Sequence, residues 1–295
     1  MMLAGMSLMA LVFFIVALIY PTLPNVSHLQ QYRPKEPLQV FSKEGLLIAE
    51  FGEERRNHVL IKHVPQKMIN AILAIEDRRF FEHPGIDIIG VLRAALKNIS
   101  GQGHEGASTI TMQVARNFFL SSERTFKRKI NEILLAIKIE NSLSKEEILE
   151  LYINQIYLGQ RAFGFSAAAN TYFNKSLAEL NLAESALLAG LPKATSRYNP
   201  LVNPELAIQR QQAVLRSMLR HGYIDNATYQ IALEEAIDLR DSVSKRELKA
   251  DYVAEMVRQE LYDEFGEGIY TSGLKVFTTI KKRNQIYANR AVQNN

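Results

Sequence analysis

The segment that begins at Glu76 carries an acid where an amphipathic helix should be apolar. Four apolar side chains around this acid share one stripe at about 100° per residue, and Glu76 falls on the same stripe. The four are Ile69, Ile72, Leu73 and Phe80. Burial disfavours the charged form of a carboxyl group and raises its pKa, which creates a general base near neutral pH. A structural carboxylate, paired with an arginine or with backbone amides, explains this helix equally well on its own.

A second acid, Glu132, lies in a helix expected from about Ser122 to Asn141. Arg128 and Lys129 precede it by four and three residues, so the three charges share one face of the helix. Apolar residues lie on this face, at Leu135 and Ile139, and on the opposite one, at Phe126, Ile130, Ile133 and Ile137. We therefore expect the charges to lie between two buried sides. Positive neighbours lower the pKa of a carboxyl group, so Glu132 suits the organisation of cations around a phosphate or a metal better than proton transfer.

Between the two acids, the segment Gly106–Asn117 is rich in hydroxyl, amide and guanidinium groups. A helix is expected to begin within it, and a helix N-terminus with such side chains suits anions and sugars. Serine and threonine after glycine are also ordinary N-caps. The composition alone therefore leaves both a binding surface and a simple helix cap open.

Composition excludes several classes of function. The 295 residues suffice for one large or two modest domains. The 35 Lys and Arg against 31 Asp and Glu give a net charge of +4, too small and too evenly spread for nucleic-acid binding, though it suits an anionic membrane or a phosphate-bearing substrate. Because the chain has no cysteine, it has no disulfide, no thiolate nucleophile and no cysteine-based metal site.

The N-terminal segment Met1–Tyr20 contains no charged side chain, and about 20 apolar residues cross a bilayer as a helix. We predict an uncleaved transmembrane anchor. A cleaved signal peptide is the alternative, but the apolar run is too long and no small-x-small cleavage site follows it. The proline-rich residues 21–37 are predicted to be a spacer.

The remaining patterns divide the chain. The runs Leu38–Phe41 and Leu46–Phe51 predict a β hairpin, and the chain is mainly helical from Pro65 to about His221, apart from a mobile glycine-bearing loop at 98–106. After about residue 240 a charged segment leads to a helix, Tyr252–Phe265, and a β-branched run, Leu274–Ile280. The predicted organisation is an anchor at 1–20, a spacer at 21–37, a catalytic domain at 38–240, and a linker with the start of a further region at 241–295.

Five ordered motifs carry a resemblance to a known family. They are Glu76-Asp77-x-x-Phe80-x-x-His83-x-Gly85, Gly106-x-Ser108-Thr109-Ile110-Thr111-x-Gln113, Arg128-Lys129-x-x-Glu132, Lys145-x-x-Ile148-Leu149-x-x-Tyr152-x-Asn154 and Arg210-x-x-x-Val214-Leu215. In order and spacing they resemble the peptidoglycan glycosyltransferases, glycosyltransferase family 51, over roughly 38–221. The continuation through Ile280 resembles the N-terminal part of class A penicillin-binding proteins of the 1A type. Met112 departs from the pattern, since the family usually carries glutamine there.

The resemblance implies a mainly α, lysozyme-like glycosyltransferase domain with an N-terminal transmembrane helix and a small β hairpin. It implies polymerisation of lipid II into β-1,4 glycan strands, with inversion and release of undecaprenyl pyrophosphate. The implied catalytic residues are Glu76 and Glu132. The implied substrate-binding residues are Asp77, Phe80, His83, Ser108, Thr109, Gln113, Arg116, Asn117, Arg128, Lys129, Tyr152 and Asn154. The resemblance implies no definite cofactor, and it leaves open whether a divalent cation, Mg²⁺ or Mn²⁺, binds at the pyrophosphate.

The same resemblance implies a single-pass protein of the bacterial inner membrane with a periplasmic catalytic domain. Its partners would be lipid II, the growing glycan chain, membrane lipid and other cell-wall synthesis proteins, with no nucleic acid. A lysozyme-like lytic enzyme is one alternative, because it too uses a glutamate with a raised pKa. A non-catalytic membrane scaffold of a cell-wall complex is the other, although it gives neither acid a role.

Overall fold

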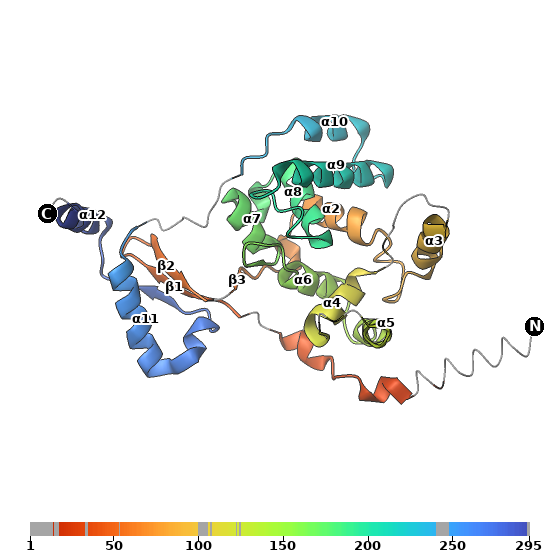
Figure 1. Cartoon of the computed structure of the whole chain (residues 1–295), viewed down its shortest axis with the longest axis horizontal. Coiled ribbons are helices and arrows are strands. Elements are labelled where there is room, and N and C mark those ends of the chain that lie inside the picture. Colours follow the sequence, from red (N-terminus) through yellow and green to blue (C-terminus); the bar gives the residue numbers. More distant parts are fainter. Residues whose placement is uncertain are drawn as a thin grey trace, which may run out of the picture.

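The computed structural model describes residues 14, 18–32, 35–52, 54–99, 106, 108–121, 123, 125–239 and 248–293. Within these ranges the chain is mainly helical, as expected, with few and short strands (Figure 1). The predicted anchor lies outside them except for residues 14 and 18–20, and the predicted mobile loop lies outside them except for residues 98, 99 and 106. No helix of the described ranges combines the length and the apolar character needed to cross a membrane.

The α helices, 3₁₀ helices (η) and strands have the following bounds: η1 Tyr20–Thr22, η2 Ser27–Gln31, β1 Leu38–Phe41, β2 Leu47–Phe51, β3 Arg55–Arg56, η3 Ile61–His63, α2 Gln66–Glu76, α3 Ile88–Ile99, α4 Ile110–Phe119, α5 Phe126–Glu140, α6 Lys145–Gln155, β4 Ala162–Phe163, α7 Phe165–Phe173, η4 Leu177–Glu179, α8 Leu182–Gly190, η5 Leu191–Lys193, α9 Pro204–Arg220, α10 Asn226–Glu234, α11 Asp251–Phe265, η7 Gly266–Tyr270, β5 Lys275–Phe277 and α12 Lys282–Gln293.

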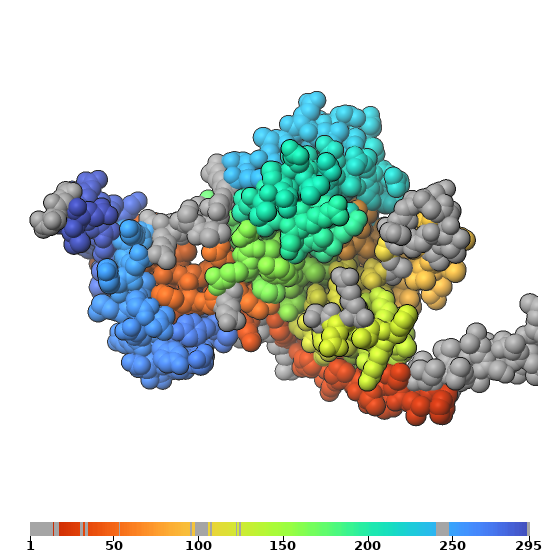
Figure 2. All heavy atoms as spheres, viewed as in Figure 1, coloured from red at the N-terminus to blue at the C-terminus, as the bar shows by residue number. Residues whose placement is uncertain are grey.

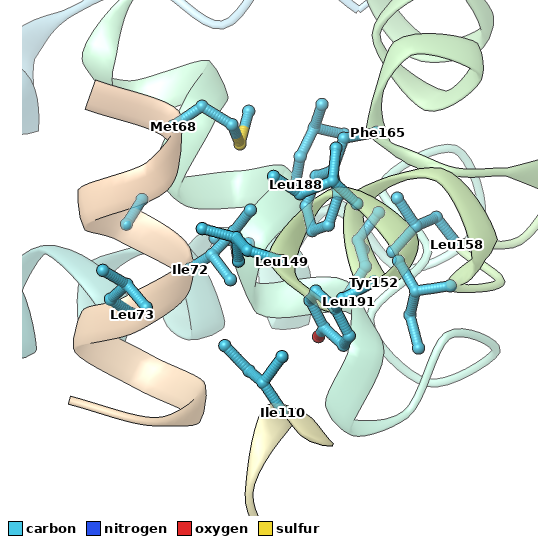
Figure 3. Packing of buried hydrophobic residues seen from close by; sticks show 14 of the residues in the cluster. Met68, Ile72, Leu73, Ile110, Leu149, Tyr152, Leu158, Phe165, Leu188 and Leu191 are labelled. Atoms are coloured by element: carbon cyan, nitrogen blue, oxygen red, sulfur yellow. The ribbon is translucent and has the colours of Figure 1, made fainter. Parts of the chain in front are cut away.

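The main core surrounds α2, which packs against α8 and α9. Figure 3 shows Met68 and Ile72 of α2 directed toward Leu149 and Tyr152 of α6 and Leu188 of α8, and all five side chains are buried. On the other side of α6, α4 packs against both α5 and α6. This core therefore brings the C-terminal end of α2, where Glu76 lies, close to α4, α6 and α9.

The predicted hairpin is confirmed: β1 and β2 pair antiparallel, and Gly45 takes the positive φ of 82° that the turn between them requires. The β-branched run at 274–280 contains a strand, since β5 pairs in parallel with β1. Leu38, Val40 and Ile48 of the hairpin share a second core with Ala254 of α11 and Ile269 of η7. The hairpin thus packs with the C-terminal region, and the domain boundaries stay a prediction.

The helix that leads to the first acid is shorter than expected. It ends at Glu76, because Asp77 leaves the helical conformation with φ −160° and ψ 77°. Phe80 therefore reaches the core through a turn, where it is fully buried, and Ile69 is only partly buried. The apolar stripe predicted the buried direction correctly, but it could not show where the helix stops.

The expectation of two buried sides for the second acid's helix is wrong. Glu132, Leu135 and Ile139 are buried, as expected, but Phe126 is 93% exposed and Ile130 is 40% exposed. The helix α5 begins at Phe126, where Thr125 caps it by accepting a hydrogen bond from the backbone N–H of Arg128. The helices α4 and α6 cover one side of α5, whereas the other apolar side is exposed at Phe126 and Ile130 and half-buried at Ile133 and Ile137.

Candidate active site

Glu76 ends α2 with a partly buried carboxyl group beside three helices. The side-chain amide of Gln113, on α4, donates a hydrogen bond of 2.7 Å to Glu76 Oε2. Tyr152 of α6 is fully buried, and its hydroxyl has no hydrogen-bond partner among the described residues. Burial contributes most to raising the pKa of the Tyr152 phenol, and the negative charge of nearby Glu76 raises it further. The core thus holds an acid, an amide and a phenol together.

Burial raises the pKa of the Glu76 carboxyl above its ordinary value. The hydrogen bond from Gln113 and the positive charges of Arg210 and Arg116 oppose this rise, and the negative charge of Asp77 adds to it. A carboxyl group with a raised pKa accepts a proton more readily than an ordinary one does. This environment fits the predicted base.

Asp77, Phe80 and His83 form a folded turn after α2. The Asp77 carboxylate lies 2.9 and 3.0 Å from His83 Nε2, and its Oδ2 accepts the backbone N–H of Ile110 at 3.0 Å. Lys145 Nζ lies 4.4 Å above the Phe80 ring. These contacts tie the turn to the start of α4 and to α6. The contacts of these three residues are with the protein interior, so their predicted substrate contacts stay a prediction.

In the polar segment before and within α4, some residues cap the helix and others lie near Glu76. Thr109 caps α4, since its hydroxyl accepts the Met112 N–H at 3.1 Å and donates to the Gly85 carbonyl at 2.6 Å. Arg116 lies within electrostatic reach of Glu76, and Asn117, the next residue, is exposed. The cap interpretation is confirmed for Thr109, and the predicted substrate contacts of this segment stay a prediction.

Glu132 is fully buried and bound by two cations. Arg128 Nη1 lies 2.7 Å from one carboxylate oxygen and Lys129 Nζ lies 2.7 Å from the other. Lys129 also donates to Ser108 Oγ at 2.9 Å, which joins this cluster to the residues before α4. The side chain of Lys129 is 41% exposed, so its ammonium can meet a ligand while Glu132 holds it in place. A cation held this way suits an anionic group such as a phosphate.

Asn154, on the same helix as Tyr152, uses its side chain within the fold. Its amide donates to the carbonyls of Val59 and Glu150 at 2.8 and 2.9 Å, and its carbonyl accepts the Val59 N–H at 2.9 Å. These bonds fix the segment before α2 against α6. The predicted substrate contact of Asn154 stays untested.

Arg210 belongs to the fifth sequence motif, yet sequence reasoning did not include it among the site residues. It lies on α9, half-buried, and its Nε donates to the Gly190 carbonyl at 3.1 Å. Desolvation lowers the pKa of its guanidinium, and the charge of Glu76 opposes that. Its place in the fifth motif was a sequence signal for a role of Arg210 in the site. Only the packing of α9 on α2, however, brings this arginine to Glu76.

The described residues around the two acids offer few ligands to a metal ion. Both oxygens of Glu132 already bind cations, and the described residues contain no group of three His, Cys, Asp or Glu side chains that could hold a metal ion. A divalent cation at this place would depend on the phosphates of a substrate for its ligands.

Comparisons agree with the resemblance. A family model described as Transglycosylase matches residues 44–219. Penicillin-binding protein 1A of Neisseria meningitidis (serogroup A / serotype 4A) is 52% identical over 290 residues, which cover 98% of this chain and 36% of that protein. Penicillin-binding protein 1A of Pseudomonas aeruginosa is 49% identical over 274 residues, with 92% and 33% covered.

The crystal structure of penicillin-binding protein 1A from Haemophilus influenzae aligns with a TM-score of 0.53 and 36% sequence identity, covering 89% of this chain and 30% of that one. The chain spans about a third of the length of these relatives. With its motifs, its helical fold and these matches, the chain belongs to the transglycosylase family, the peptidoglycan glycosyltransferases of cell wall synthesis.

Proposed function

We propose that this chain polymerises lipid II into β-1,4 glycan strands by direct displacement, with Glu76 as the base. The observation that carries the proposal is the environment of Glu76, a carboxyl group of raised pKa held by Gln113 beside two arginines. Glu76 takes the proton of the acceptor 4-hydroxyl as the hydroxyl oxygen attacks the anomeric carbon of the donor sugar. The bond from that carbon to the pyrophosphate breaks on the opposite side, so an α-linked donor gives a β-linked product.

The leaving pyrophosphate carries negative charge, which the cluster of Arg128, Lys129 and Glu132 is suited to receive. The exposed ammonium of Lys129 supports this role, because Glu132 orients the cation without blocking it. Ser108 adds a hydroxyl beside the same ammonium. Charge-assisted contacts to phosphate are stronger than neutral ones and grow stronger as charge develops on the leaving group.

A membrane location fits the apolar surface of the catalytic body. On α3, Ile88, Ile89, Leu92 and Leu96 are 60–70% exposed, and Phe126 at the start of α5 is 93% exposed. Figures 1 and 2 show α5, in yellow-green, beside the red segment at residues 18–31, and Lys138 of α5 donates to the carbonyls of Leu23 and Pro24. A surface of this kind suits contact with lipid. We infer that Met1–Tyr20 anchors the chain in the inner membrane as a single span, with the lysozyme-like catalytic domain periplasmic and other cell-wall synthesis proteins as partners.

The test is the reaction of the purified full chain with lipid II in detergent or vesicles. Glycan strands sensitive to a β-1,4-specific glycosidase, together with released undecaprenyl pyrophosphate, are the expected products. A lytic enzyme would shorten preformed strands without releasing that product, and a scaffold would do neither. Glu76→Gln should abolish polymerisation and leave binding of lipid II intact, because the amide keeps the shape but cannot take the proton. Turnover by this variant within tenfold of the parent would exclude Glu76 as the base.

A further inference from the structure

A cavity of about 340 Å³ lies between η5, the loop after it and α9. Four cationic side chains line it, Lys193, Arg197, Arg210 and Arg216, and no acidic side chain does. The volume is at the lower end of small-ligand pockets, about 300–1,000 Å³, so it suits part of a substrate rather than a whole disaccharide.

Within the described part of the chain, the carboxylate that acts on these four cations is Glu76, through its charge on Arg210. None of them forms an ion pair with a carboxylate of the described residues. Tyr198 lies between two of the guanidinium groups, with Arg197 Cζ 5.7 Å and Arg210 Cζ 5.9 Å from its ring centroid. Lys193, Arg197 and Arg216 are exposed and Arg210 is half-buried, and all four line the same cavity. That arrangement favours an anionic ligand.

Arg210 links this cavity to the proposed active site. Its charge acts on Glu76, and it also lines the cavity. Its Nε donates to the Gly190 carbonyl at 3.1 Å, and the glycine leaves room for the side chain, because a Cβ there would come within 2.8 Å of Arg210 Cγ. An anion bound in the cavity therefore belongs to the part of the substrate that approaches Glu76 from the side of α9.

The cavity lies beside α9 and has no lining residue on α5. Figure 1 shows α8 and α9 on one side of the helical body and α5, with the N-terminal segment, on the other. The proposed pyrophosphate cluster lies on α5. A lipid-linked phosphate must stay near the membrane, whereas the peptide stem of lipid II projects into water and ends in carboxylates.

We propose, on the basis of the proposed function, that this cavity binds carboxylate groups of the peptide stem on the acceptor saccharide. Three guanidinium groups suit carboxylates well, since each can donate two parallel hydrogen bonds. Arg197, Arg216 and Lys193 hold the stem, and Arg210 connects the stem site to Glu76. The stem thereby guides the acceptor 4-hydroxyl toward the base, which makes the peptide a determinant of acceptor choice.

The direct test measures binding of N-acetylmuramyl pentapeptide, which carries the stem but no lipid and no phosphate. The comparison is between the parent, Arg197→Gln, Arg216→Gln and the control Arg220→Gln, which lies one turn further along α9, is exposed and does not line the cavity. We expect each cavity variant to bind about tenfold more weakly, as for loss of one charge-assisted contact, and the control to bind like the parent. Inorganic pyrophosphate that binds the parent more tightly than the peptide does, and is weakened by the same two variants, would mean that the cavity takes a phosphate and would overturn the stem site.

Kinetics give the second readout, with lipid II and an analogue that lacks the stem. Arg216→Gln should raise KM for stem-bearing lipid II about tenfold with kcat little changed, and should leave both constants unchanged for the analogue. Equal losses on both substrates, or a parent that does not bind the muramyl peptide at millimolar concentration, would overturn the stem site. A parent that binds the peptide but never polymerises lipid II would instead refute the proposed function alone.

Discussion

Gln113 gives the sharpest test of Glu76 as a base, because its amide donates a 2.7 Å hydrogen bond to the acid's carboxylate. This bond stabilises the charged form and lowers the pKa of Glu76, in opposition to burial. Gln113→Leu keeps much of the volume and removes the donor, so the pKa of Glu76 should rise further. A larger share of the acid is then protonated at low pH, and the acid limb of the pH–rate profile should move to higher pH.

The size of the effect follows from the hydrogen bond. A bond to a charged group contributes about 1.5–3 kcal/mol, and the partial exposure of Glu76 places this one at the lower end. About 1.5 kcal/mol corresponds to about a tenfold loss of kcat/KM on the acid limb. At high pH, Glu76 is deprotonated in both proteins, so the loss should largely disappear.

The assay is the initial rate of polymerisation of lipid II between acidic and alkaline pH. Thr111→Val is the matched control, because Thr111 lies on the same helix and its hydroxyl donates to a different acid, Glu140, at 2.5 Å. That variant should keep the parent's pH profile. An acid limb that stays in place or moves to lower pH would refute the reasoning. An equal loss at every pH would mean that Gln113 acts on the substrate instead.

The other predictions concern the two acids and the membrane. Glu76→Gln should unfold at the same temperature as the parent, or at a higher one, in a melting curve at neutral pH. The pKa of Glu76 is raised in the folded protein, so its charged form destabilises the fold above that pKa, and the amide removes the charge. Arg128→Ala should lower the free energy of unfolding by about 3 kcal/mol, because it leaves the buried Glu132 one cation short; adding Glu132→Gln should restore stability in denaturant titrations but not polymerisation. Deletion of Met1–Tyr20 should reduce turnover of long-chain lipid II more than of a short-chain analogue, and equal losses would limit the segment to folding or stability.

The sequence could predict the elements that local signals define. The hairpin around Gly45, the capping box of Ser144 and Glu147, and the helix that begins at Pro204 all have such signals, and the structure contains each of them. Helix ends without a local signal were less accurate, as at Glu76. The predicted partner of Glu132 was correct because residues four apart meet on a helix.

Contacts between distant segments could not be predicted in this way. The approach of Arg210 to Glu76 depends on how α9 packs against α2, and periodicity carries no information on that. The exposure of one apolar side of α5 could not be predicted for the same reason, since an apolar face has the same sequence pattern whether protein or lipid covers it. Tyr152 was predicted through the family resemblance, but its buried, unpartnered hydroxyl beside Glu76 is a property of the packed core.

The pairing of β5 with β1 also sets an order of events during synthesis. Gln39 pairs with Lys275, so the whole catalytic body lies in the chain between two neighbouring strands of one small sheet. As the chain leaves the ribosome, the helices around α2 have every partner they need before β5 exists, whereas the hairpin must wait with one edge unpaired. An unpaired strand edge invites pairing with other chains. The strand β5 therefore does more than complete a sheet: it ends the interval in which the edge of β1 is open to pairing with other chains.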